Sequence, residues 1–206
     1  ETYKPTHVVH LAAKVGGIKD NISKPAEYFN DNILINTHIM NMCKIYNVKR
    51  FVGILSTCVY PDVVKSYPMT EKDLFSGPPT STNFSYGYAK RCLAVHINAH
   101  NKQYGTKYNY LIPCNLYSEY DNIKHENKMH FVTALLKKIK LSTQELNLLG
   151  TGKPLRQFMY AGDLAKVIKI VIDKDITDSF NVATSENLSI NEMTNIALKS
   201  LKKKLK

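Results

Sequence analysis

Tyr86 and Lys90 are the two residues whose types and spacing best suit chemistry. They stand four residues apart where a helical pattern begins, so their side chains should share one face of a helix. A neighbouring ammonium favours the phenolate and lowers the pKa of the tyrosine, which suits a proton donor to a substrate oxygen. This spacing also arises by chance in lysine-rich chains, so the surrounding residues must distinguish a catalytic pair from an ordinary helical face.

A hydroxyl and a thiol follow the apolar run 50–55, at Ser56 and Cys58. The serine could donate a hydrogen bond to the carbonyl oxygen that Tyr86 protonates. The thiol could serve as a proton-transfer base if its pKa were lowered. The alternative for Cys58 is a small buried apolar residue, which is the commoner fate of such a cysteine.

Alternating strand and helix patterns must position these residues. We expect a buried parallel strand over 7–13, a helix over 25–48 and a second buried strand over 50–55. A long binding loop should lead to the catalytic helix and then to a third strand. The loop spans 61–83, the helix spans 85–104 and ends at Gly105, and the third strand spans 108–113. The pattern predicts an α/β fold with a Rossmann-like parallel sheet flanked by helices.

The second half of the chain is predicted to add a partial, smaller α/β substrate domain. It should hold a helix over 129–141, short strands over 146–149 and 180–182, a helix over 163–173 that follows residues 156–160, and a final helix. Asp163 is a plausible N-cap for the helix over 163–173. Ser189, with Glu192 three residues later, predicts a capping box for the final helix.

Composition narrows the class of protein. The chain has 206 residues, 44% hydrophobic residues and a formal net charge of +11, which fits one sizeable globular core. The lysines are scattered except in the tail 199–206, so we expect no nucleic-acid binding and interpret the tail as a solvated helical face or a basic arm. No apolar run is long enough for a transmembrane helix, so no membrane partner is expected.

The four cysteines contain no Cys-x-x-Cys pair, which argues against a zinc site or disulfide framework and favours a reducing, cytoplasmic location. His96 and His100 stand at metal-ligand spacing, but no third ligand accompanies them. We therefore expect no metal and place both histidines on a solvated helical face.

Several motifs together resemble the extended short-chain dehydrogenase/reductase superfamily. One strand ends in Leu-Ala-Ala at 11–13, the next in Ser-Thr at 56–57, Tyr-x-x-x-Lys follows, and a further strand ends in Pro-x-Asn at 113–115. Within that superfamily, AKVGGI at 13–18, LSTCVYPD at 55–62 and GTGKPLRQF at 150–158 resemble the GDP-L-fucose synthase family. The resemblance runs from about residue 7 to residue 182.

The resemblance implies NADPH-dependent 3,5-epimerisation and 4-reduction of GDP-4-keto-6-deoxy-D-mannose. Tyr86 would protonate the C4 oxygen as NADPH delivers hydride, Lys90 would lower the tyrosine pKa and hold the nicotinamide ribose, and Ser56 would orient the carbonyl. Cys58 and His130 match the family's base and acid for inverting C3 and C5. Protons next to a ketone are acidic enough for a thiolate and an imidazole to exchange them.

The same resemblance implies the residues that bind the ligands and a homodimer as the assembly. The NADP(H) positions are Leu11, Ala12, Ala13, Leu55, Ser56, Tyr86, Lys90, Pro113, Asn115, Leu116 and His130. The GDP-sugar positions are Val15, Gly16, Lys138, Leu149 and Arg156, of which the two cations suit a diphosphate.

The chain departs from the family pattern in four places, one of which is Thr133, where a proline is usual. The Gly-x-x-Gly-x-x-Gly loop is not found and would lie before residue 1, so we expect residues 1–120 to be the C-terminal part of an NADP-binding domain and 121–206 a partial substrate-binding region interleaved with it. Residues 118–120 replace Gly-Pro-His, and Leu149 replaces an aromatic residue. Two alternatives stay open: another nucleotide-sugar epimerase/reductase of the superfamily, or a non-catalytic nucleotide-binding module.

Overall fold

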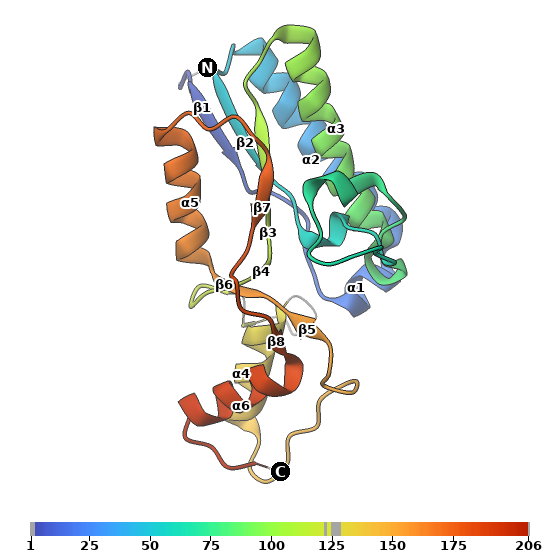
Figure 1. The fold of residues 1–206 in the computed structure, drawn as a ribbon, viewed down its shortest axis with the longest axis vertical. Coiled ribbons are helices and arrows are strands. Elements are labelled where there is room, and N and C mark those ends of the chain that lie inside the picture. The colour runs from blue at the N-terminus through green and yellow to red at the C-terminus, as the bar shows by residue number, and fades with distance from the viewer. Residues whose placement is uncertain (1–2, 122, 125–128, 206) are drawn as a thin grey trace.

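A computed structural model describes residues 3–121, 123–124 and 129–205 of the chain. It contains two bodies, one above the other along the longest axis (Figure 1). The sheet body is built on a four-stranded sheet, and the helical body is built on α4 (Phe131–Leu141) and α6 (Ile190–Ser200).

The sheet confirms the predicted α/β class with a parallel, Rossmann-like core. Its strands run in the order β1-β2-β3-β7, and every neighbouring pair is parallel. Parallel neighbours need crossover connections, which α2 (Pro25–Ile45), α3 (Phe84–Tyr104) and α5 (Ala161–Asp173) supply. The strands are β1 (His7–His10), β2 (Arg50–Ile54), β3 (Asn109–Pro113) and β7 (Phe180–Val182).

β2 and β3 are buried along their whole length, as their apolar runs predict. The expectation of a buried strand over 7–13 is wrong in two respects. β1 ends at His10, and three of its four residues are at least partly exposed. The reason is its position at the edge of the described sheet, where β2 is its one partner.

Helices cover both faces of the sheet (Figure 1). α2 (Pro25–Ile45) and α3 (Phe84–Tyr104) lie side by side on one face, with the short α1 (Ile18–Ser23) near the start of α3, and α5 (Ala161–Asp173) covers the other face. Alternate residues of β2 point to opposite cores: Phe51 packs with α2 and α3, and Val52 packs with α5. Burying each such side chain contributes about 1.5–3 kcal/mol.

The segment 61–83 is anchored to the far strand of the sheet. Glu71 Oε1 accepts a hydrogen bond from the backbone N–H of Asn181 at 2.6 Å. The hydroxyl of Tyr60 donates to Oδ1 of the same asparagine at 2.7 Å. Short 3-10 turns at Thr57–Val59, Glu71–Phe75 and Ser81–Asn83 shape the rest, so this long connection is a folded part of the sheet body.

The helical body joins α4 to α6 through a small apolar cluster centred on Leu135, Ile139 and Ala197. The strand predicted over 146–149 is wrong, because the segment forms no strand and instead packs Leu146 and Leu148 against that cluster. Two two-stranded sheets link this body to the other. They pair β4 (Asn115–Tyr117) with β6 (Phe158–Tyr160) and β5 (Leu155–Arg156) with β8 (Leu188–Ser189).

The predicted N-caps of two helices, α6 and α5, can be compared with the structure. The capping box of α6 is confirmed: Ser189 Oγ accepts from the N–H of Glu192 at 3.1 Å, and the N–H of Ser189 donates to Oε2 of Glu192 at 2.7 Å. Asp163 is not an N-cap, because α5 begins two residues earlier, after Tyr160. Asp163 lies in the first turn and pairs with Lys166 at 2.9 Å.

The prediction for the two histidines of α3 is wrong for His100, which is buried against the rings of Tyr104 and Tyr108. No group of three or more His, Cys, Asp or Glu side chains among the described residues is placed to hold a metal ion. No helix in the described part of the chain is long and apolar enough to cross a membrane. All four cysteines are free thiols, as the spacing predicts.

The lysine-rich tail is not a continuation of the last helix. α6 ends at Ser200, Leu205 packs against the α4–α6 cluster, and Lys203 Nζ donates to the carbonyl of Ser142 at 3.0 Å. Residue 206, the last of the predicted basic tail, lies outside the described residues.

Candidate active site

Ser56, Cys58, Tyr86 and Lys90 come together where β2 ends and α3 begins. Ser56 leaves β2 in an extended conformation and caps the following 3-10 turn, where its Oγ accepts a hydrogen bond from the N–H of Cys58 at 3.4 Å. The start of α3 packs against this turn. A Cβ at Gly87 would lie 2.5 Å from the carbonyl oxygen of Cys58, so only glycine permits this approach.

Lys90 is buried, with 2% of its surface exposed, beneath the end of β2. Its Nζ donates a hydrogen bond to the carbonyl of Ile54 at 2.8 Å and lies 6.0 Å from the centre of the Tyr86 ring. Burial lowers the pKa of Lys90 to about 8. An ammonium in this environment keeps two further N–H donors for a ligand.

The environment of Tyr86 opposes the expected lowering of its pKa. Burial raises the pKa of the phenol, the nearby Cys58 raises it further, and a hydrogen bond with Ser56 acts in the opposite direction. The expectation of a lowered pKa is therefore wrong, because burial raises the pKa of the phenol and the ammonium of Lys90 is bonded to the Ile54 carbonyl. Tyr86 thus stays protonated, as a proton donor must.

Cys58 is half-buried, and its Sγ accepts a hydrogen bond from Nδ2 of Asn83 at 2.8 Å. Burial raises the pKa of its thiol, whereas hydrogen bonding from Ser56 and the positive charge of Arg156 lower it. The net shift is upward, so the lowered pKa that a thiolate base would need is not found. The opposing influences come from both bodies of the molecule, since Arg156 belongs to β5.

His130 does not join this cluster. It is the N-cap residue of α4 in the helical body, its side chain is exposed, and it makes no side-chain capping hydrogen bond. None of the contacts described for Ser56, Cys58, Tyr86 or Lys90 involves it.

The residues expected to line a dinucleotide follow three adjacent strands. Leu11, Ala12 and Ala13 follow β1, Leu55 follows β2, and Pro113 ends β3 before Asn115 and Leu116. Because the three strands are parallel neighbours, these positions share the carboxyl edge of the sheet, where open α/β sheets bind ligands. Leu11 is 61% exposed, whereas Leu55 and Pro113 are buried.

The residues expected to hold a GDP-sugar divide between the two bodies. In the sheet body, Val15 is exposed, and Gly16 lies so close to Tyr28 that a Cβ would be 2.0 Å from its hydroxyl. In the helical body, Lys138 donates to the carbonyl of Asn147, and Leu149 is 89% exposed.

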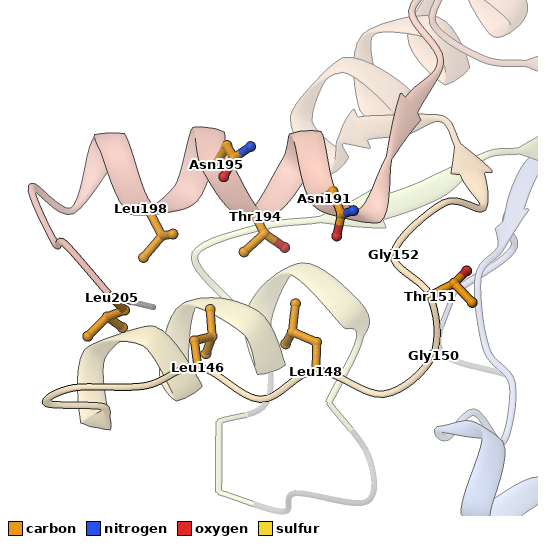
Figure 2. Close-up of a pocket in the computed structure, with 10 residues that line it drawn as sticks. All are labelled: Leu146, Leu148, Gly150, Thr151, Gly152, Asn191, Thr194, Asn195, Leu198 and Leu205. Atoms are coloured by element: carbon orange, nitrogen blue, oxygen red, sulfur yellow. The ribbon is translucent and has the colours of Figure 1, made fainter.

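A cavity of about 320 Å³ lies in the helical body, on the side of residues 146–152 that faces α6 (Figure 2). Figure 2 shows Leu146 and Leu148 directed toward Thr194 and Leu198 of α6. None of the four clustered residues lines this cavity. Its lining is Leu146, Leu148, Gly150, Thr151, Gly152, Asn191, Thr194, Asn195, Leu198 and Leu205.

Two neighbours of the cluster were missed in the sequence. Asn83 contacts the thiol of Cys58, and the ring of Tyr28 meets the ring of Tyr86 edge-on, with centroids 6.4 Å apart. Tyr28 stands far from Tyr86 in the sequence, so no local signal points to it. Asn83 carries a weak signal, because an asparagine directly before a helix is a typical N-cap.

A parallel sheet flanked by helices, one of which carries a Tyr–Lys pair beside the carboxyl edge of the sheet, is a Rossmann-like α/β architecture. The model of the NAD dependent epimerase/dehydratase family matches residues 1–183. The chain belongs to that family, and the resemblance drawn from its motifs is confirmed.

Three relatives illustrate this membership. GDP-L-fucose synthase of Dictyostelium discoideum is 45% identical over 169 residues, which is 81% of this chain and 52% of the relative. GDP-L-colitose synthase of Yersinia pseudotuberculosis is 32% identical over 208 residues, 97% of this chain and 66% of the relative. The structure of a GDP-L-fucose synthetase from Naegleria fowleri bound to NADP is 30% identical, with a TM-score of 0.85, and the match covers 97% of this chain and 63% of that one. The chain therefore spans about half to two thirds of their length.

Proposed function

We propose that this chain carries the catalytic part of an NADPH-dependent GDP-sugar epimerase/reductase that converts GDP-4-keto-6-deoxy-D-mannose to GDP-L-fucose. The observation that supports this most strongly is the cluster of Ser56, Cys58, Tyr86 and Lys90 at the end of β2. The names of the Dictyostelium, Yersinia and Naegleria relatives support the GDP-sugar class.

The carboxyl edge of the sheet fits NADP(H). Small and apolar residues at 11–13 leave room for a ligand beside the backbone. Lys90 lies at the buried end of this edge with two N–H donors beyond the one given to Ile54, which suits ribose hydroxyls. When bound, NADPH supplies the hydride for reduction at C4.

The residues of the cluster then complete the reduction. Ser56 orients the C4 carbonyl of the sugar, and the protonated Tyr86 donates its proton to the carbonyl oxygen, so that the ketone becomes an alcohol. The raised pKa of Tyr86 suits this role, because the phenol holds its proton until the oxygen becomes strongly basic. The ammonium of Lys90 stabilises the phenolate that remains.

Epimerisation requires that protons next to the ketone be removed and returned. In this proposal the thiolate form of Cys58 is the base, although burial keeps the pKa of the thiol raised: a C–H bond breaks, an S–H bond forms, and the electron pair enters the enolate. Arg156 favours the thiolate through its charge and neutralises the diphosphate together with Lys138. His130 supplies the proton from the opposite face, Leu149 contacts the guanine, and Val15 and Gly16 contact the sugar.

The domain assignment and the assembly complete the proposal. Residues 1–120 form the C-terminal part of the NADP-binding domain, and 121–206 form a partial substrate region that returns α5 and β7 to the sheet. A cytoplasmic homodimer would bury apolar side chains that α2 and α3 expose. Among these are Phe29, Leu34, Met42, Ile45 and Val95.

The test uses the protein expressed from its complete gene, with GDP-4-keto-6-deoxymannose and NADPH. Absorbance follows NADPH oxidation, and chromatography identifies the product. Wild type should yield GDP-fucose, Tyr86→Phe should abolish hydride transfer, and Cys58→Ser should yield reduced sugar that has not been epimerised. If wild type oxidises no NADPH with this substrate, another nucleotide sugar or a non-catalytic binding module replaces this proposal.

A further inference from the structure

Asn83 occupies the N-cap position of α3 without using its side chain as a cap. Asparagine is among the preferred N-cap residues because its side-chain oxygen can accept a hydrogen bond from a free N–H of the first turn. In α3 no such hydrogen bond forms. The Oδ1 atom of Asn83 is buried and has no hydrogen-bond partner among the described residues.

The amide is directed instead at the thiol of Cys58. Its Nδ2 lies 2.8 Å from Sγ and donates a hydrogen bond to it. A buried carbonyl left without a partner is unfavourable. In this conformation the side chain of Asn83 makes no cap, and its oxygen has no hydrogen-bond partner among the described residues. The hydrogen bond that the side chain does make is the one to the sulfur of Cys58.

The surroundings hold both partners of this contact. The close approach of Gly87 to the carbonyl of Cys58 brings the start of α3 against the turn that carries the thiol. The titratable or charged groups that act on Sγ are Tyr86 on α3 and Arg156 on β5. Asn83, at the N-cap position of α3, is a neutral donor to the sulfur, and a neutral donor stabilises a thiolate without binding the diphosphate.

We propose that Asn83 is a positioning residue for epimerisation, which fixes Sγ of Cys58 and stabilises its thiolate. This inference rests on the proposed function, in which Cys58 takes a proton from the sugar. When that base forms, the sulfur gains negative charge, and a hydrogen bond to a charged acceptor is stronger than one to a neutral acceptor. Asn83 acts on epimerisation through Cys58, whereas the proton given to the C4 oxygen comes from Tyr86.

The decisive variant is Asn83→Asp, in the full-length protein. Aspartate caps a helix as well as asparagine does, so the start of α3 is preserved. It replaces the N–H donor with an anionic acceptor and therefore disfavours the thiolate. Asn98→Asp is the matched control, because residue 98 is exposed on the same helix and about 22 Å from residue 83 at 1.5 Å per residue.

The first readout is the pH dependence of Cys58 alkylation by iodoacetamide, followed by peptide mass spectrometry. The exposed Cys92 serves as an internal reference for the reagent. In Asn83→Asp the Cys58 profile should move up by about one pH unit or more, which means about tenfold slower alkylation below the pKa. Cys92 should be unaffected, and Asn98→Asp should match wild type at both sites.

The second readout is the ratio of epimerised to unepimerised product, which should fall about tenfold or more in Asn83→Asp. Asn83→Ser, which keeps a good N-cap but is too short to reach the sulfur, should give a smaller change in the same direction. An unchanged Cys58 profile in Asn83→Asp would overturn the inference about Asn83. Because alkylation needs no substrate, this result is independent of whether the proposed GDP-sugar activity is found.

Discussion

The two bodies of the molecule hold their functional residues in different ways. In the sheet body, Lys90 is 2% exposed and bonded to a strand carbonyl, and the thiol of Cys58 is bonded to Asn83 and raises the pKa of Tyr86. In the helical body and the short sheets that link it to the sheet body, His130, Lys138 and Arg156 are exposed, and Leu149 is 89% exposed. In the proposed function, the proton-transferring groups of the sheet body are therefore held by close neighbours, whereas the groups proposed to contact the GDP-sugar, and the proposed acid His130, face solvent.

Among substitutions that test this difference between the two bodies, we expect the largest effect on activity from Lys90. Lys90→Met removes the buried ammonium while keeping the volume of the chain, and it should reduce the rate of C4 reduction by about 10²-fold or more, in the range of a lost acid–base group. Steady-state NADPH oxidation measures this. Lys102→Met, in the last turn of the same helix, is the control and should behave as wild type.

The same lysine predicts opposite effects of pH on activity and stability. Since burial lowers the pKa of Lys90 to about 8, reduction should fall as pH rises through that value. The unfolded chain holds this proton more tightly than the folded chain, so the free energy of unfolding should gain a contribution as pH rises from about 8 toward the ordinary lysine pKa of about 10.4.

Urea denaturation at about pH 7.5 and about pH 10 checks the sign, because the difference between wild type and Lys90→Met isolates this group from others that titrate there. The free energy of unfolding of wild type, relative to that of Lys90→Met, should rise between the two pH values. A fall would contradict the lowered pKa of Lys90.

Arg156 should give the next largest effect, of a different kind. Arg156→Gln removes one cation that the proposed function places against the diphosphate, and KM for the GDP-sugar should rise about 10–100-fold, since a charged hydrogen bond contributes about 1.5–3 kcal/mol. Because Arg156 also lowers the thiol pKa, alkylation of Cys58 should slow. Lys153→Gln, on the exposed turn nearby, is the matched loss of charge and should leave both readouts unchanged.

Leu149 should give the smallest effect. Its side chain packs against little in the chain, so Leu149→Ser should change the free energy of unfolding by less than about 0.5 kcal/mol. If it contacts the guanine, KM should rise only a few-fold, and Leu149→Trp should lower it. Calorimetry measures the change in stability, and titration with GDP measures the change in nucleotide binding. A large loss of stability in Leu149→Ser would mean that the residue is structural.

Much of the sheet body could be predicted from the sequence, because β2 and β3 are uninterrupted apolar runs and α3 ends at a glycine in the left-handed conformation. The predictions that were wrong concern residues whose environment is set by neighbours distant in the sequence. The apolar pattern of β1 could not reveal an edge position, and Leu146 and Leu148 alternate like a strand although they pack under α6. His100 is buried by Tyr108, which arrives from beyond the helix.

The cluster of Ser56, Cys58, Tyr86 and Lys90 could be predicted as a set, since its members lie at strand and helix ends that the pattern places together. The direction of the Tyr86 pKa could not, because it depends on how deeply the ring is buried and on where the ammonium of Lys90 points. The roles assigned to these residues, and to His130, Lys138 and Arg156, stay predictions.

The central claim is that one cluster performs two separable reactions, and exchange in D₂O tests it most directly. The full-length protein is given GDP-4-keto-6-deoxymannose and NADPH in D₂O, and mass spectrometry counts deuterium in the sugar while absorbance follows NADPH. The account predicts that Tyr86→Phe still incorporates deuterium at C3 and C5 without oxidising NADPH, and that Cys58→Ser oxidises NADPH without that incorporation. Loss of both activities together in each variant, with the fold retained, would contradict it.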